Sequence, residues 1–129
     1  MTPLEVIQRL YTAFQHRDDT SFRKLCSPDI EWIQNQGFPG GKTYRGPDAI
    51  IDGVFKRNNS LWDDFRFEIE SMHAAEDVVT VIGQYTGTNP VSKHPFHVAA
   101  AHTYNVDGNA VTKFRQFTDT HILHQFLAS

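Results

Sequence analysis

The sequence contains one cysteine, Cys26, among its 129 residues. A single thiol cannot form an internal disulfide and cannot supply a thiolate metal cluster. A low cysteine content is typical of proteins from the reducing cytosol. We therefore expect a cytoplasmic protein. The chain also lacks a basic start followed by an apolar run, and no stretch approaches the about 20 apolar residues that span a bilayer. We therefore expect no secretion signal and no membrane partner.

An excess of basic charge is absent too. Twelve Lys and Arg face fifteen Asp and Glu, so the net charge is -3. No basic field exists to hold a phosphate backbone, and the aromatic residues do not alternate with Lys or Arg as stacking platforms for single strands do. We expect no nucleic-acid partner. The length and the 40% hydrophobic content are those of one globular domain, which we expect to span residues 1–129.

Signatures of cofactor and metal chemistry are missing as well. The seven histidines do not show metal-ligand spacing beside carboxylates on a helix. The glycine-rich stretch 37–41 lacks the Lys-Ser/Thr of a phosphate loop, and neither a serine elbow nor a Cys–His signature occurs. The sequence predicts no cofactor and no metal.

What is present is a helical half followed by a strand-rich half. Thr2 to Glu5 forms a capping box, and an apolar stripe continues to Phe14. A short helix over 20–25 and a third helix after Gly46 are expected, then strands over 65–70, 78–88, 96–106 and 110–120. Helices first and an antiparallel sheet afterwards predict an α+β fold. The segment 35–46 has four glycines and a proline, so we interpret it as a lid or pocket rim.

Asp107-Gly108 is a strong hairpin signal. If Asp107 and Gly108 form a two-residue turn, Val106 pairs with Asn109. This pairing fixes which side chains of the two strands share a face of the hairpin. One face carries Val98, Ala100 and His102 on one strand beside Arg115, Phe117 and Asp119 on the other. An apolar wall with a few inward polar groups is typical of a ligand pocket.

Plainer interpretations of the same residues stay open. An Asp near a strand end is more often a turn or cap residue than a catalyst, and a lone strand His is usually structural. Lys113 and Arg115 are most simply solvated, which would turn this face outward. Tyr11, Trp32 and Phe55 are most simply part of the core.

Several motifs resemble the ketosteroid isomerase-like proteins, which share the nuclear transport factor 2-like fold. These are Val6 to Phe14, Ser27 to Trp32, Tyr44 to Ile50, Ala101 to Tyr104, and Phe114 to Thr120 after the Asp107-Gly108 turn. The order at the end of the chain is similar to the SnoaL-like polyketide cyclase branch. The resemblance implies a cone-shaped, curved, antiparallel-rich sheet wrapped around three helices in the N-terminal half, a single pocket, and a homodimer.

The resemblance also implies roles for particular residues. Asp119 matches the acid/base Asp of SnoaL-like cyclases, and Phe117 matches a pocket aromatic. The sequence departs from the isomerases at two positions: their catalytic Tyr falls at about Leu10, beside Tyr11, and their general-base Asp falls near Gln34. Steroid isomerisation itself is therefore not implied.

We expect a small apolar molecule as the partner, and two classes of function remain. One is cofactor-free acid–base chemistry of an isomerase, cyclase or lyase on an apolar carbonyl compound. Asp119 would then move the proton, and His102, Arg115 or Tyr11 would bond the developing oxyanion. The expected pocket residues are Tyr11, Trp32, Phe55, Trp62, Val98, Ala100, Arg115 and Phe117.

The other class is a non-catalytic binding protein, in which Asp119 only orients the ligand or bonds to backbone. A third interpretation, a protein-interaction domain, predicts that large aromatic side chains fill the cone. Epoxide hydrolysis ranks below proton transfer, because a second carboxylate beside Arg115 and Asp119 is not evident.

Overall fold

The structure is a computed structural model, and it describes residues 1–128. Its N-terminal half is helical. α1 (Pro3–Gln15) begins at Thr2, whose hydroxyl accepts the Glu5 backbone N–H while the Glu5 carboxylate accepts the Thr2 N–H. This is the predicted capping box. α2 (Asp19–Leu25) is short. α3 (Pro47–Ile50), η1 (Ile51–Phe55) and α4 (Lys56–Leu61) follow one another without a break, and η1 is a π-helical turn.

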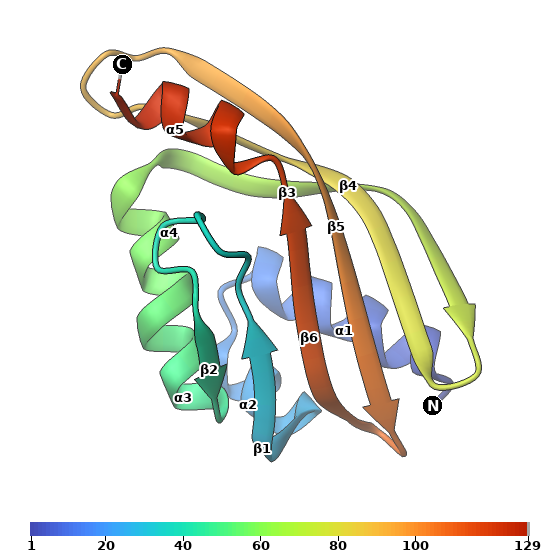
Figure 1. Cartoon of the computed structure of the whole chain (residues 1–129). Helices are drawn as coiled ribbons and strands as arrows, with labels where there is room; N and C mark the ends of the chain where they lie inside the picture. Colours follow the sequence, from blue (N-terminus) through green and yellow to red (C-terminus); the bar gives the residue numbers. More distant parts are fainter. Residues whose placement is uncertain (129) are drawn as a thin grey trace.

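Six strands form one curved, open sheet in the order β2-β1-β6-β5-β4-β3. They are β1 (Cys26–Ile33), β2 (Thr43–Arg45), β3 (Asp63–Ala75), β4 (Val78–Thr88), β5 (Pro95–Asp107) and β6 (Ala110–Thr118). Neighbours are antiparallel except for β1 and β6, which are parallel. In Figure 1 the long strands curve past α1 and the α3–α4 helix, and α5 (Thr120–Ala128) lies across their upper end. The predicted α+β cone with a curved, antiparallel-rich sheet is confirmed.

The β5–β6 hairpin differs from the prediction. Asp107 pairs with Ala110, so the turn residues are Gly108 and Asn109. The pairing then steps from Val106↔Val111 to Asn105↔Lys113, which leaves Thr112 as an extra residue in β6. An extra residue in one strand reverses the faces of the side chains that follow it.

The predicted face of β6 was therefore wrong. From Lys113 onward the even-numbered residues of β6 point toward the helices. Phe114 and Gln116 are buried, whereas Arg115 and Phe117 are exposed on the outer face of the sheet.

Aromatic rings pack the interior in two clusters. The larger joins α1 and α2 to the sheet and contains Phe22, Trp32 and Phe114, with Trp32 stacked on Phe114 at 3.8 Å between ring centres. The smaller cluster lies where α5 packs on the sheet, and we call it the mouth cluster. Its members are Phe38, Trp62, Tyr85, Phe96, Val98, Ala100 and Leu123.

No helix among residues 1–128 is long and apolar enough to cross a membrane.

Candidate functional site

The polar centre of the interior is His102, on β5. Its Nδ1 lies 2.6 Å from the hydroxyl oxygen of Tyr11 on α1, and its Nε2 lies 2.6 Å from the hydroxyl oxygen of Tyr85 on β4. The network continues at both ends: Tyr104 donates to Tyr11 at 2.9 Å, and the Gln116 amide donates to Tyr85 at 2.7 Å. One imidazole thus connects α1 with three strands of the sheet.

All five side chains are buried, and burial fixes their charge. Desolvation lowers the pKa of His102 to about 3, so the imidazole is neutral at physiological pH. Desolvation raises the pKa of Tyr85, although the hydrogen bond from Gln116 opposes the shift. It also raises the pKa of Tyr11 well above its ordinary value. The network can therefore donate hydrogen bonds at neutral pH, but its imidazole is a weak base.

The network holds one more hydroxyl hydrogen than it has acceptors. A neutral imidazole has one N–H, so it donates to one tyrosine and accepts from the other. If Nδ1 carries the hydrogen, Tyr11 receives hydrogen bonds from both His102 and Tyr104. If Nε2 carries it, Tyr85 receives from both His102 and Gln116. Either way, one hydroxyl keeps a hydrogen for which residues 1–128 provide no acceptor.

Tyr85 joins this network to the mouth cluster. Its ring centre lies 5.7 Å from that of Phe38, which comes from the loop after β1. Leu123 of α5 is fully buried against the same cluster. Two hydrogen bonds attach α5 to neighbouring loops. His124 Nε2 donates to the Gly37 carbonyl oxygen at 2.6 Å, and Asn89 Nδ2 donates to the Phe126 carbonyl oxygen at 2.8 Å.

Two buried polar atoms on α4 and at its end have no partner among the described residues. They are Oδ1 of Asn58 and Nε1 of Trp62, one helical turn apart. The Trp62 ring packs against Phe96 with 4.4 Å between the ring centres. A buried donor or acceptor without a partner costs free energy, so a polar ligand atom beside either group would be stabilised.

Asp119 lies apart from the network. It is exposed at the start of α5, where its Oδ1 accepts the backbone N–H of Ile122 at 3.1 Å. Arg115 and Phe117 lie together on the outer face, with the guanidinium 5.0 Å from the ring centre. A catalytic role for Asp119, and pocket roles for Arg115 and Phe117, stay predictions.

The other predicted residues fall into three groups. Tyr11 and His102 are hydrogen-bonded to each other, Trp62, Val98 and Ala100 belong to the mouth cluster, and Trp32 and Phe55 pack in the larger cluster. Sequence reasoning missed Tyr85 and Gln116. The alternation of β4 places Tyr85 on the inner face, so a signal for it existed. Gln116 faces inward only because of the bulge at Thr112.

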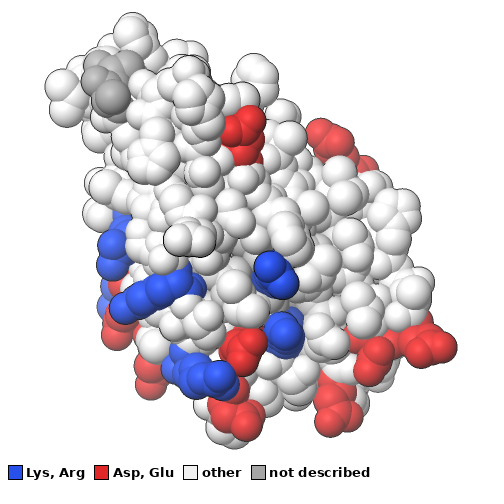
Figure 2. All heavy atoms as spheres, in the orientation of Figure 1, with Lys and Arg blue, Asp and Glu red and all other residues white. Residues whose placement is uncertain are grey.

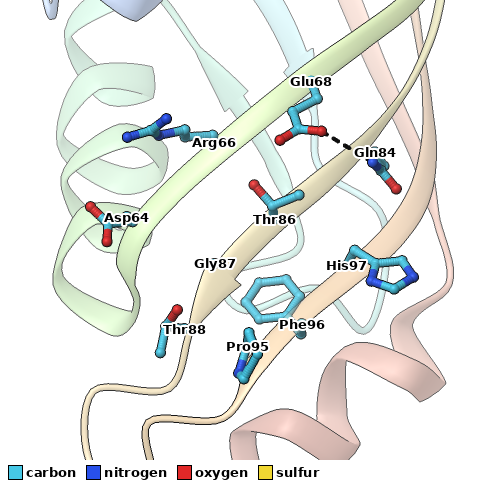
Figure 3. A pocket seen from close by; sticks show the side chains of 10 residues that line it. All are labelled: Asp64, Arg66, Glu68, Gln84, Thr86, Gly87, Thr88, Pro95, Phe96 and His97. Carbon is cyan, nitrogen blue, oxygen red and sulfur yellow. Dashed lines mark hydrogen bonds between the residues drawn. The ribbon is translucent and has the colours of Figure 1, made fainter.

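An open groove of about 580 Å³ lies on the outer side of β3, β4 and β5. Figure 3 shows Arg66, Glu68, Thr86 and His97 among the side chains that line it, with Glu68 accepting a hydrogen bond from Gln84. The groove mixes both signs of charge and has no enclosed apolar wall, so it does not resemble a typical small-molecule site. The interior network is the better candidate.

Comparison with known proteins agrees with this fold. Residues 7–114 match the SnoaL-like domain family. An NTF2-like protein from Burkholderia thailandensis E264 is 34% identical, with a TM-score of 0.93 and 98% of each chain covered. No curated protein matches the chain.

Two more distant structures are similar in fold alone. TerC, co-crystallised with polyporic acid, is 20% identical with a TM-score of 0.87, and 98% of each chain is covered. A protein from Shewanella putrefaciens CN-32, proposed to be a SnoaL-like polyketide cyclase, is 19% identical with a TM-score of 0.80. The match covers 98% of this chain and 96% of that one. With its family match over residues 7–114 and its NTF2-like, ketosteroid isomerase-like fold, this chain belongs to the SnoaL-like family.

Proposed function

We propose that this protein binds a small, mostly apolar molecule at the mouth cluster, through an oxygen atom that accepts the spare hydroxyl hydrogen of the Tyr11–His102–Tyr85 network. The observation that carries the proposal is the hydrogen count around His102. An oxygen at Tyr85 selects the tautomer with the imidazole hydrogen on Nε2. Tyr85 then accepts from His102 and Gln116 and donates to the ligand, which satisfies every member of the network.

The surroundings of Tyr85 favour an apolar ligand with few polar groups. The rings of Phe38, Phe65 and Trp62 and the side chain of Leu123 supply apolar walls. The unpartnered indole N–H of Trp62 and side-chain amide oxygen of Asn58 would fix the orientation of one further polar group. Because Phe38 and Leu123 fill this space, the ligand enters by displacing Phe38 or α5.

Catalysis is the second candidate, because the same donor would stabilise an enolate oxygen as well as a carbonyl oxygen. An isomerase, cyclase or lyase reaction also needs a base near the mouth. His102 is too weak a base, and the carboxylate of Asp119 is bonded to backbone at the start of α5. Binding without turnover is therefore the first proposal. Acid–base chemistry would require the Asp119 carboxylate to break its hydrogen bond with the Ile122 backbone N–H and turn toward the mouth cluster.

The test uses a naphthol as a probe, because it is an apolar ring system that carries a single hydroxyl oxygen able to accept a hydrogen bond. Calorimetric titration compares Phe38→Ala with the double variant Phe38→Ala/Tyr85→Phe. We expect Phe38→Ala to bind more tightly than the parent because it makes room. Loss of the Tyr85 hydroxyl should then weaken binding about two- to tenfold, the effect of one hydrogen bond between neutral groups.

The matched control is Tyr44→Phe, whose hydroxyl donates to the Gly40 carbonyl oxygen outside the mouth cluster. It should leave the affinity unchanged. Equal affinity with and without the Tyr85 hydroxyl would remove the basis of the proposal. Polyporic acid, the compound crystallised with TerC, serves as a second probe. For a bound ketone, incorporation of deuterium beside the carbonyl in heavy water that disappears in Asp119→Asn would favour the catalytic candidate.

We also propose a homodimer formed through the outer face of the sheet. Ile82, Ala101 and Phe117 are paired neighbours across β4, β5 and β6, so they form one apolar row. Ile82 is 37% exposed and Phe117 is 43% exposed. A central apolar row with polar residues around it is the usual composition of a subunit contact.

A further inference from the structure

A second groove lies where β1 ends, and its lining is basic. Its volume is about 430 Å³, and β1, β2, β6 and the loop 34–42 form its walls. Thr43, Ile33 and Arg115 stand in one row across three strands, and Lys42 lies beside them. Two of the residues that line the groove are basic and none is acidic.

The charges of Lys42 and Arg115 are not neutralised by neighbouring carboxylates among the described residues. Within residues 1–128 neither Lys42 nor Arg115 forms an ion pair. Each rests on an aromatic ring instead: Lys42 Nζ lies 5.1 Å from the ring centre of Tyr44, and the Arg115 guanidinium rests on Phe117. The rings hold the charges in place without neutralising them.

The neighbouring cations provide a contrast. Arg45 and Lys113 both approach Glu31, at 3.0 and 3.8 Å. Figure 2 shows that basic side chains gather on this side of the molecule, over β2, β1 and β6. Acidic side chains, including Glu31, lie among these cations, but no acidic residue of the described chain lines the groove beside Lys42 and Arg115, so the groove itself attracts anions.

The end of the groove offers an unused hydrogen-bond donor. Gln34 lines the groove and is only 4% exposed. Its carbonyl oxygen accepts the indole N–H of Trp32 at 3.1 Å, which fixes the amide plane. Its amide nitrogen has no partner among the described residues. Gln116 differs, because its amide is bonded to both Tyr85 and the Asn35 backbone.

We propose that this groove binds the oxyanion of a small molecule, a carboxylate or a phosphate, between Lys42 and Arg115, with the Gln34 amide donating to it. Charge-assisted hydrogen bonds of this kind are shorter and stronger than neutral ones. The groove is separate from the mouth cluster, so this inference does not rest on the proposed function.

The test follows the side-chain amide signal of Gln34 by nitrogen–proton NMR during titration with inorganic phosphate at constant ionic strength. We expect a saturable shift of that signal. Lys42→Gln and Arg115→Gln should each weaken the affinity about three- to fivefold, the effect of one exposed charge pair. Lys113→Gln is the matched control, since it removes the same charge from a residue that pairs with Glu31 outside the groove.

A shift that grows linearly with both phosphate and malonate, or an equal loss of affinity in Lys113→Gln, would overturn the inference, because diffuse surface attraction would then explain the result. A parallel titration with malonate distinguishes the two ligand chemistries. Saturation by malonate alone assigns the groove to carboxylates, and saturation by phosphate alone assigns it to phosphates. Because the readout is at Gln34, failure here leaves the test at Tyr85 unaffected.

Discussion

Replacing His102 by Gln should flatten the acid side of the stability–pH curve. The imidazole is buried between two tyrosine hydroxyls, and its pKa in the folded protein is about 3. In the unfolded chain the pKa returns to about 6.5. Between these two values the unfolded state binds a proton that the folded state does not. The free energy of unfolding therefore falls as the pH falls through this window.

The size of the effect follows from the pKa difference. Each pKa unit corresponds to about 1.4 kcal/mol, so His102 alone should remove roughly 2–3 kcal/mol between about pH 6.5 and about pH 4.5. Gln cannot take up this proton. At neutral pH the His102→Gln variant should be less stable, by about 1–3 kcal/mol, because the tyrosine hydroxyls lose part of their hydrogen bonding. The two stability curves should therefore converge as the pH falls.

Urea unfolding at several values from about pH 7 to about pH 4.5 measures both curves. The matched control is His97→Gln, an exposed histidine on the same strand, which should keep the slope of the parent protein. Parallel curves for the parent and His102→Gln would mean that His102 titrates normally. The neutral network, and the hydrogen count that rests on it, would then be wrong.

Three further outcomes follow from particular contacts. Phe117→Asp should convert a dimer to a monomer in sedimentation equilibrium, while Val91→Asp, at an exposed loop position off the sheet face, should not; a monomeric parent at high concentration would refute the proposed dimer. Asp119→Ala should lower the free energy of unfolding by about 1 kcal/mol, because the cap on the Ile122 N–H is lost. Asp119→Asn should lower it by much less, and equal losses would show that charge and not capping matters. Gly41→Ala should destabilise the protein and broaden the Gln34 amide signal, because the added carbon would overlap the Asn35 carbonyl oxygen. Gly108→Ala, with no atom near its added carbon, should leave that signal unchanged.

The elements that the sequence predicted well depend on local signals. The capping box at Thr2 and the apolar stripe of α1 need only residues within one or two turns, and both are present in the structure. The face of β6 depends on one extra residue at Thr112, whose hydroxyl donates to the Asn105 carbonyl oxygen. A threonine in a strand carries no mark that distinguishes a bulge from a regular pair. Arg115 and Phe117 were therefore assigned to the wrong face.

The candidate site was predictable only in part for the same reason. His102 and Tyr11 were each singled out, one by strand position and the other by its place beside the isomerases' tyrosine. Their hydrogen bond joins residues 91 positions apart, so it depends on how α1 lies on the sheet. Tyr85 could be placed on the inner face from the alternation of β4, yet nothing in the sequence indicated that its partner would be the other nitrogen of the same imidazole.

The distribution of polar groups in the interior favours binding over catalysis. Proton transfer beside a carbonyl group requires a donor for the oxygen and a base for the carbon-bound hydrogen. The interior supplies the donor, since the tyrosines stay protonated and one hydroxyl hydrogen is left over. Among residues 1–128, no base lies in the same place: His102 takes up no second proton above about pH 3, and Asp119 caps α5 from the surface. Position 34, near which the isomerases have a carboxylate, carries a glutamine that accepts from Trp32. With the donor and without the base, the proposed site would hold a carbonyl ligand, and removal of its proton would require a base from elsewhere, such as Asp119 released from the start of α5.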